Sequence, residues 1–243
     1  MLLTAQLYVF SKMSDPERQI DGILKALAAA GYQAVEGMYR LPPQQADALA
    51  RHGLLYFAPH LTPNELDPLD PALTFCRAMG AGHICTSGLL EWNSRSAGDY
   101  RRSAAALNDL GRRLRGEGLR LLYHNHEFEF EKVEGATTGM DILLELLDPC
   151  CVRLCLDIGW LWCAGANPVR FLREHGARIA AVHLRDFKGK ASVALGRGDV
   201  DLPSILDAVR QLPHLEALVV EQDPATPDPL GDMLASRAYL AAR

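Results

Sequence analysis

The chain has 243 residues, of which 49% are hydrophobic and 23% are charged. This composition can bury a substantial core and excludes an intrinsically disordered chain. The formal net charge is −5 and the sequence contains no cluster of Lys and Arg, so we expect the partner to be a small molecule and not a nucleic acid.

The start of the chain, MLLTAQLYVFSKMS, lacks the basic segment and the cleavage site of a signal peptide. No stretch approaches the roughly 20 apolar residues that a membrane span requires. The six cysteines form no CxxC pair, which favours reduced and mostly buried thiols. These features predict a cytoplasmic protein that does not enter a membrane.

Short apolar runs alternate with amphipathic helical stretches along the whole chain. In chain order, the predicted strands are AQLYVF, YQAVEGM, LLYFAPH, GHICTSG, LRLLYHNH, VRLCLD, IAAVHLRD and ALVVEQD. The first predicted helix begins after a capping pattern at Ser14 and ends at Gly31, and the longest spans residues 96–117. The other helical stretches are PPQQADALARHG, DPALTFCRAMG, GMDILLELL, NPVRFLREHG, DLPSILDAVRQL and the final PLGDMLASRAYLAAR.

Eight strands that alternate with eight helices in 243 residues are the pattern of an α/β (β/α)₈ TIM barrel. An open, doubly wound sheet is the structural alternative, because alternation alone does not require closure. No linker or shift in composition divides the chain, so we expect residues 1–243 to form a single domain.

Polar residues follow the later predicted strands, at the end of a barrel where active sites lie. Strand five runs into His124, Asn125, His126 and Glu127, and the next three strands end in Asp157, His183 and Glu221, respectively. Converging buried carboxylates would repel one another and would be costly to desolvate. One divalent metal ion, Mn²⁺, Mg²⁺, Co²⁺, Fe²⁺ or Zn²⁺, removes both problems.

Each of these residues also has a simpler interpretation when it is taken alone. Asp157 could cap the following turn, His183 could be a core histidine, and Glu221 could pair with a buried Arg or Lys. Because all three occur at successive strand ends, we favour the metal site.

The segments YHNHEFEF, LDIGWLWCAGANPVRFLREHGARIAAVHLRDFKG and VVEQD resemble the sugar phosphate isomerase/epimerase family of the xylose isomerase-like TIM barrels. LGRGDVDLPSIL extends the resemblance over nearly the whole chain. The resemblance implies a metal set that includes Asp157, His183 and Glu221. Trp160 stands where the related apurinic endonucleases have a zinc-binding histidine, which argues against DNA repair.

The fourth metal ligand remains open between several residues of one segment. In the family's epimerases a Glu occupies the position of Tyr123. If the strand stays extended, Glu127 and Glu129 lie on one face and His124 and His126 on the other. We choose Glu127 as the fourth ligand, with His126 and Glu129 as the alternatives.

The resemblance implies proton abstraction from a carbon next to a metal-chelated carbonyl, through an enediolate. The leading expectation is a sugar or polyol isomerase or epimerase that uses Glu221, His124 or His126 as the proton-transfer groups. The alternative is a dehydratase or lyase of an inosose-like or 3-keto-sugar, and a non-catalytic sugar-binding barrel is a third reading. A homo-oligomer is possible. Further pocket candidates are His60, Glu36, Glu129, Arg185, Lys188, Arg197 and Trp92.

Overall fold

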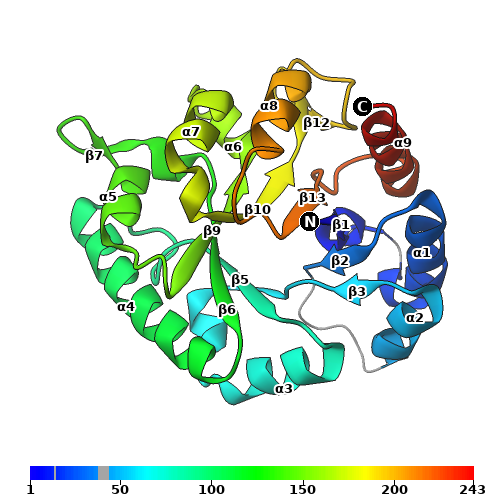
Figure 1. Ribbon diagram of the computed structural model, residues 1–243, viewed down its shortest axis with the longest axis horizontal. Coiled ribbons are helices and arrows are strands. Elements are labelled where there is room, and N and C mark those ends of the chain that lie inside the picture. The colour runs from blue at the N-terminus through cyan, green and yellow to red at the C-terminus, as the bar shows by residue number, and fades with distance from the viewer. Residues whose placement is uncertain (14, 38–43) are drawn as a thin grey trace.

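The computed structural model describes residues 1–13, 15–37 and 44–243 and contains a nine-stranded sheet in which every pairing is parallel (Figure 1). The strand order is β3-β2-β1-β13-β10-β9-β6-β5-β4. The strands are β1 (Leu2–Gln6), β2 (Ala34–Glu36), β3 (Leu55–Tyr56), β4 (His60–Leu61), β5 (His83–Ser87), β6 (Arg120–His124), β9 (Val152–Asp157), β10 (Ile179–Leu184) and β13 (Ala217–Val220).

The two ends of this strand order, β3 and β4, belong to one run of chain, and this closes the sheet. On one side Phe57 donates its backbone N–H to the Val35 oxygen at 2.8 Å, and on the other Cys85 donates to the Pro59 oxygen at 2.9 Å. The run over residues 55–61 therefore occupies one strand position, and the barrel has eight such positions. The TIM barrel prediction is confirmed, and the open doubly wound alternative is wrong.

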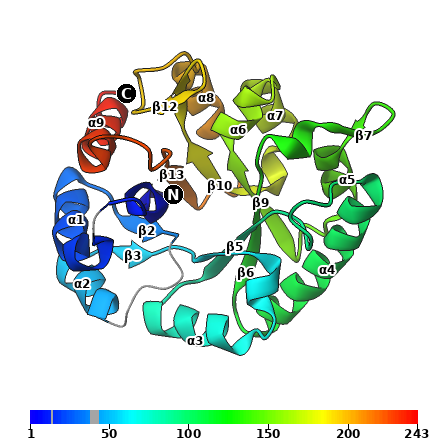
Figure 2. The ribbon, with the colours of Figure 1, turned by 180° about the vertical axis from the view of Figure 1, so that it is seen from behind.

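The helices form a ring outside the strands, as both views show (Figures 1 and 2). Their bounds are α1 (Pro16–Ala30), α2 (Gln44–His52), α3 (Asp70–Met79), α4 (Ala97–Gly116), α5 (Gly139–Leu146), α6 (Ile158–Cys163), α7 (Pro168–His175), α8 (Leu202–Val209) and α9 (Pro229–Ala241). Of the helices in the described residues, α6 alone was not predicted. The described part of the chain contains no helix with the length and apolar character of a membrane span.

The first predicted strand is only partly correct. β1 ends at Gln6, and Leu7–Phe10 form a 3₁₀ helix whose N-terminus is capped by the Gln6 side chain. The predicted cap at Ser14, the predicted strand end at Met38 and the predicted helix start at Pro42 lie outside the described residues. Asp15 accepts the Arg18 N–H at 3.3 Å and caps α1.

Two apolar layers hold the barrel together. The larger lies between the strands and the helices, and includes Leu24, Leu107 and Leu156. A second cluster consists of strand residues that fill the barrel interior and are mostly small, including Ala34, Ala58, Cys85, Cys155, Ala181 and Ala217. All six cysteines are free, and four of them are buried. Small interior side chains leave room for larger polar groups at one end.

We predict opposite effects for two Gly→Ala substitutions in α4. A Cβ at Gly111 would lie 2.5 Å from the Cys151 carbonyl oxygen, whereas a Cβ at Gly116 meets nothing within 4 Å. Gly111→Ala should lower the free energy of unfolding by about 1–3 kcal/mol through overpacking. Gly116→Ala should raise it by up to about 1 kcal/mol through helix propensity.

Urea denaturation of both variants and the wild type, followed by circular dichroism, measures this difference. Equal stabilities for the two variants would contradict the close approach of α4 to the loop before β9.

Candidate functional site

Four side chains from adjacent strands meet at the carboxyl ends of these strands. His124 is the last residue of β6, Asp157 ends β9, His183 lies in β10 and Glu221 follows β13. One ligand atom of each lies within 4.8 Å of the others, and all four residues are buried. Because these strands are neighbours in the sheet order, their ends bring the side chains together without help from long loops.

Asp157 is held from two sides. Its Oδ1 accepts the Trp160 N–H at 2.9 Å and caps α6, while Oδ2 lies 3.4 Å from both His124 Nε2 and Arg185 Nη1. The Asn125 side-chain amide accepts the backbone N–H of Asp157 at 2.9 Å and donates to the backbone carbonyl oxygen of Asp157 at 3.2 Å. Capping and membership of the cluster are therefore compatible roles of this carboxylate.

His183 lies between two carboxylates. Its Nε2 contacts Glu36 Oε1 and its Nδ1 contacts Glu221 Oε2. Burial alone would lower the pKa of His183, but the charges of Cys155, Glu36 and Glu221 outweigh it and raise the pKa. Burial likewise opposes ionisation of Glu221, whereas His183 and Arg185 lower the pKa of its carboxyl.

The cluster has the chemistry of a metal-binding set. Both ring nitrogens of His124 and of His183 and the Oε2 of Glu221 are buried and form no hydrogen bond, although His124 and His183 lie in ion-pair contact with carboxylates. Such atoms are costly to bury unless something else binds them. Two imidazoles and two carboxylates suit borderline divalent ions. The sequence predicts three carboxylates and one imidazole, whereas in the structure His124 lies in the cluster and Glu127 does not.

The expectation that strand five stays extended through Glu129 is wrong. β6 ends at His124, and after a turn Glu127 stands at the start of the 3₁₀ helix Phe128–Phe130, where it is exposed. Glu129 is buried elsewhere: it accepts the Tyr123 hydroxyl at 2.7 Å and the His126 N–H at 2.7 Å. The alternation of faces no longer applies after the turn, and neither carboxylate joins the cluster.

A cavity of about 490 Å³ opens beside the cluster. It is lined by Gln6, Tyr8, Gly37, His60, Ser87, Trp92, His124, His126, Trp160, Arg185, Glu221 and Asp223. Six of the predicted site residues are in this lining. Lys188 and Arg197 are not: both side chains are exposed, and Arg197 lies 3.4 Å from Asp232.

The cavity wall contains groups that the sequence analysis did not select. Gln6, Tyr8 and Asp223 were missed, although Gln6 and Asp223 follow the same strand-end pattern as the selected residues. His126 is packed against Trp92, with ring centroids 5.2 Å apart, and against Trp160. Burial lowers the pKa of His126 to about 3, so its imidazole is neutral at pH 7.

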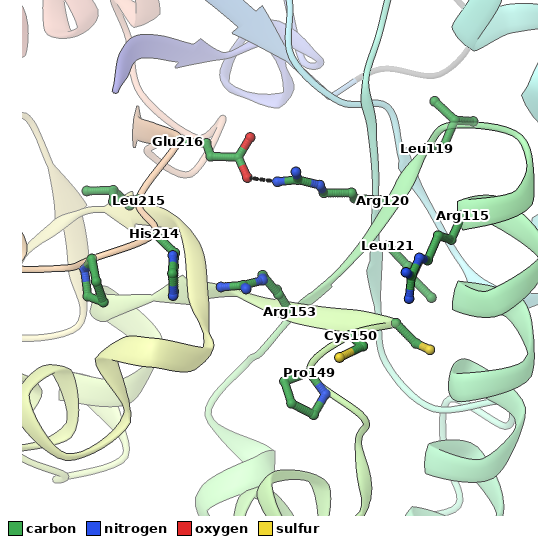
Figure 3. Close-up of a pocket in the computed structure, with 12 residues that line it drawn as sticks. Arg115, Leu119, Arg120, Leu121, Pro149, Cys150, Arg153, His214, Leu215 and Glu216 are labelled. Atoms are coloured by element: carbon green, nitrogen blue, oxygen red, sulfur yellow. Dashed lines mark hydrogen bonds and ion pairs between the residues drawn. The ribbon is translucent and has the colours of Figure 1, made fainter.

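A larger cavity of about 740 Å³ lies at the opposite ends of the strands (Figure 3). Arg115, Arg120, Arg153 and His214 line it, and Glu216 pairs there with Arg120. This is the amino-terminal face of the barrel, where conserved function is not found in TIM barrels. The site chemistry therefore belongs to the smaller cavity.

The chain is similar to a family of known proteins. A profile of the family described as Xylose isomerase-like TIM barrel matches residues 24–242. The chain is similar to an inosose dehydratase from Clostridium tetani (strain Massachusetts / E88), with 28% identity over 163 residues, which are 58% of this chain and 54% of that protein. The chain thus spans about half the length of the curated relatives it matches.

Two solved structures share the fold. A sugar phosphate isomerase/epimerase from Parabacteroides distasonis ATCC 8503 has a TM-score of 0.84 and 21% identity, with 99% of this chain and 93% of that chain covered. The IOLI protein with a binding zinc atom has a TM-score of 0.78 and 16% identity, with 100% and 97% covered. At these identities the likeness concerns the fold alone.

The buried Glu129 predicts a pH dependence of stability. Burial raises the pKa of its carboxyl from 4.5 to about 8. The folded state therefore keeps Glu129 protonated where the unfolded chain ionises it. The protonated Glu129 thus contributes to the free energy of unfolding. This contribution is complete below pH 4.5 and is lost as the pH rises towards 8, by up to about 1.4 kcal/mol per pH unit.

Glu129→Gln should flatten the fall in the free energy of unfolding between pH 5 and pH 8, because glutamine does not ionise. Denaturant melts at several pH values test this, with the exposed Glu131→Gln as the control. A Glu129→Gln variant with the same pH profile as the wild type would contradict it.

Proposed function

The chain belongs to the xylose isomerase-like TIM barrel family, and we propose that it is a metal-dependent lyase that eliminates water from an inosose-like polyol or a keto-sugar. The observation that carries the proposal is the convergence of His124, Asp157, His183 and Glu221, with unpartnered buried atoms, beside a sugar-sized cavity. The similarity to inosose dehydratases supports elimination as the outcome.

The proposed roles follow from where each side chain lies. His124, Asp157, His183 and Glu221 would hold a divalent ion, which when bound supplies a Lewis acid for a carbonyl oxygen. His126 lies outside this set and faces the cavity, where its imidazole is placed to accept the proton from the carbon beside the carbonyl. The C–H and the β C–O bonds break, a C=C bond forms, and the hydroxyl leaves as water after it is protonated.

His60 is suited to the second proton transfer. It lines the cavity, and its Nε2 lies 3.0 Å from Glu36 Oε1. The His124 ring stands between the two imidazoles, with centroids 5.5 Å from His60 and 5.0 Å from His126. A proton can therefore be removed at one side of the cavity and delivered at another.

Isomerisation or epimerisation is the second candidate. Glu221 and His126 both face the cavity, so a proton that one removes could be returned to carbon by the other. Against this reading, the strand-five position of the cluster is His124, whereas the resemblance to the epimerases implies a glutamate pair. Elimination needs only one base and one acid, which the histidines supply.

The charge of the cavity supports an uncharged substrate. Among the described lining residues, Arg185 carries the one permanent positive charge. Its guanidinium already contacts Asp157, Glu221 and Asp223 and lies over the Trp160 ring. A phosphate group would therefore meet carboxylates, and apart from the proposed metal ion no described lining residue offers it a free positive charge. We propose a polyol ketone without phosphate.

Metal-replete protein, incubated in D₂O with inososes and 3-keto-sugars, should release products that are lighter by one water. Asp157→Asn should lower kcat/KM by at least about 100-fold, because it removes a ligand and the partner of Arg185. The exposed Asp207→Asn should retain wild-type activity. Product mass and deuterium content decide the outcome: deuterium uptake without loss of water would replace the lyase by the isomerase.

Phosphorylated and free forms of an accepted substrate should differ in kcat/KM by at least about tenfold, in favour of the free form, because like charges in a cavity repel. Steady-state rates with matched pairs of substrates measure this. A preference for the phosphorylated form would contradict the neutral-substrate proposal and leave the elimination chemistry intact.

A further inference from the structure

Glu36 is a fully buried carboxylate that is not part of the four-residue cluster. It ends β2, on the side of the barrel opposite β9 in the sheet order. One oxygen, Oε1, lies 3.0 Å from Gln6 Nε2 and 3.0 Å from His60 Nε2, and it contacts His183 Nε2. A buried carboxylate is retained only where it has such partners. Here all three partners meet a single oxygen atom.

The two nitrogens of His183 face different groups. Nδ1 points to Glu221 and the cluster, whereas Nε2 points to Glu36. A neutral imidazole carries one N–H, and the other nitrogen keeps the lone pair that a metal needs. If the N–H is on Nε2, the lone pair of Nδ1 faces the cluster.

We propose that Glu36 is a positioning residue that accepts the Nε2–H of His183 and thereby fixes the tautomer and ring plane that present Nδ1 to the metal. This inference rests on the proposed metal site. The two atoms already touch, so a small rotation of the imidazole aligns the N–H with the carboxylate. Carboxylates in this position hold metal-bound histidines in many proteins and strengthen metal binding.

Cys155 is the other group near this side of His183, and Glu36, Cys155 and His183 could form a second metal set. An ion there would require His183 to bind metal through both nitrogens. A carboxylate that accepts an N–H needs no second ion. The two arrangements differ in stoichiometry: one ion per chain, or two.

Glu36 also connects the metal cluster to the substrate wall. Gln6 and His60 line the cavity and contact the same oxygen that contacts His183. Gly37 leaves space for this arrangement: its φ is +90°, and a Cβ there would lie 1.8 Å from Gln6 Oε1. Removal of the carboxylate should therefore affect metal binding and the orientation of two cavity residues together.

The test compares Glu36→Ala and Glu36→Gln with the wild type in titrations with Zn²⁺, in competition with a chromophoric chelator. Glu36→Ala should weaken Zn²⁺ binding by about 10–100-fold, as loss of such an orienting partner does elsewhere. Glu36→Gln should recover part of the affinity, because its amide oxygen can still accept the N–H. A structural defect alone would not be relieved in this way by one hydrogen-bond acceptor.

Glu216→Gln is the matched control. Glu216 also contacts a histidine, with 3.2 Å from its Oε2 to His83 Nε2, but at the opposite end of the barrel. The Zn²⁺ affinity of Glu216→Gln should equal that of the wild type. The absorption spectrum of bound Co²⁺ gives a second readout, and it should change in Glu36→Gln and stay unchanged in Glu216→Gln. That comparison remains available if Glu36→Ala does not fold.

Wild-type affinity in Glu36→Ala, with binding still lost in Asp157→Asn, would overturn the role of Glu36 and leave the proposed metal site intact. Two Zn²⁺ ions per wild-type chain, one of them lost in Cys155→Ser, would overturn it by making Glu36 a ligand. A wild type that binds neither Zn²⁺ nor Co²⁺ would overturn both the inference and the proposed function.

Discussion

The carboxyl end of the barrel buries three carboxylates, which need positive or hydrogen-bonding partners. Glu36, Asp157 and Glu221 are each less than 10% exposed, and Arg185 is the one permanent cation among them. Arg185 contacts Asp157 and Glu221 and is also shared with Asp223. Buried carboxylates without compensation destabilise a fold by several kcal/mol. The neighbouring imidazoles, and the cation that we propose between them, compensate these buried carboxylates and so stabilise the folded state.

The rest of the structure serves this arrangement. Parallel pairing brings the ends of β6, β9, β10 and β13 to one edge, so residues far apart in sequence become neighbours. Beneath them the barrel interior contains mostly small side chains, such as Ala181 and Ala217, which leave volume for imidazole rings. Larger interior residues would fill the barrel more evenly and would push these rings outwards. Core packing and site chemistry are therefore coupled.

The fold and three members of the cluster could be predicted from sequence because they depend on local patterns. Strand and helix periodicities alternate, and Asp157, His183 and Glu221 each interrupt an apolar run at its end. The sequence predicts Glu127 as the fourth member, with His126 and Glu129 as alternatives, whereas the structure brings His124 into the cluster because β6 stops there. That point is set by contacts across strands, among them the hydrogen bonds between Asn125 and the Asp157 backbone. Sequence spacing contains no record of such contacts, and an assumed extended strand placed Glu127 on the wrong side.

The replacement of a carboxylate by His124 changes the electrostatics of the site. Asp157 and Glu221 together carry two negative charges, which match one divalent cation, and two imidazoles complete the set without adding charge. A third carboxylate would leave the set negative and would weaken its pull on the electrons of a carbonyl. It would also supply a second carboxylate base. In the site that we propose, His124 in place of a third carboxylate would leave the metal a stronger electrophile, which would favour expulsion of a hydroxyl over return of the proton to carbon.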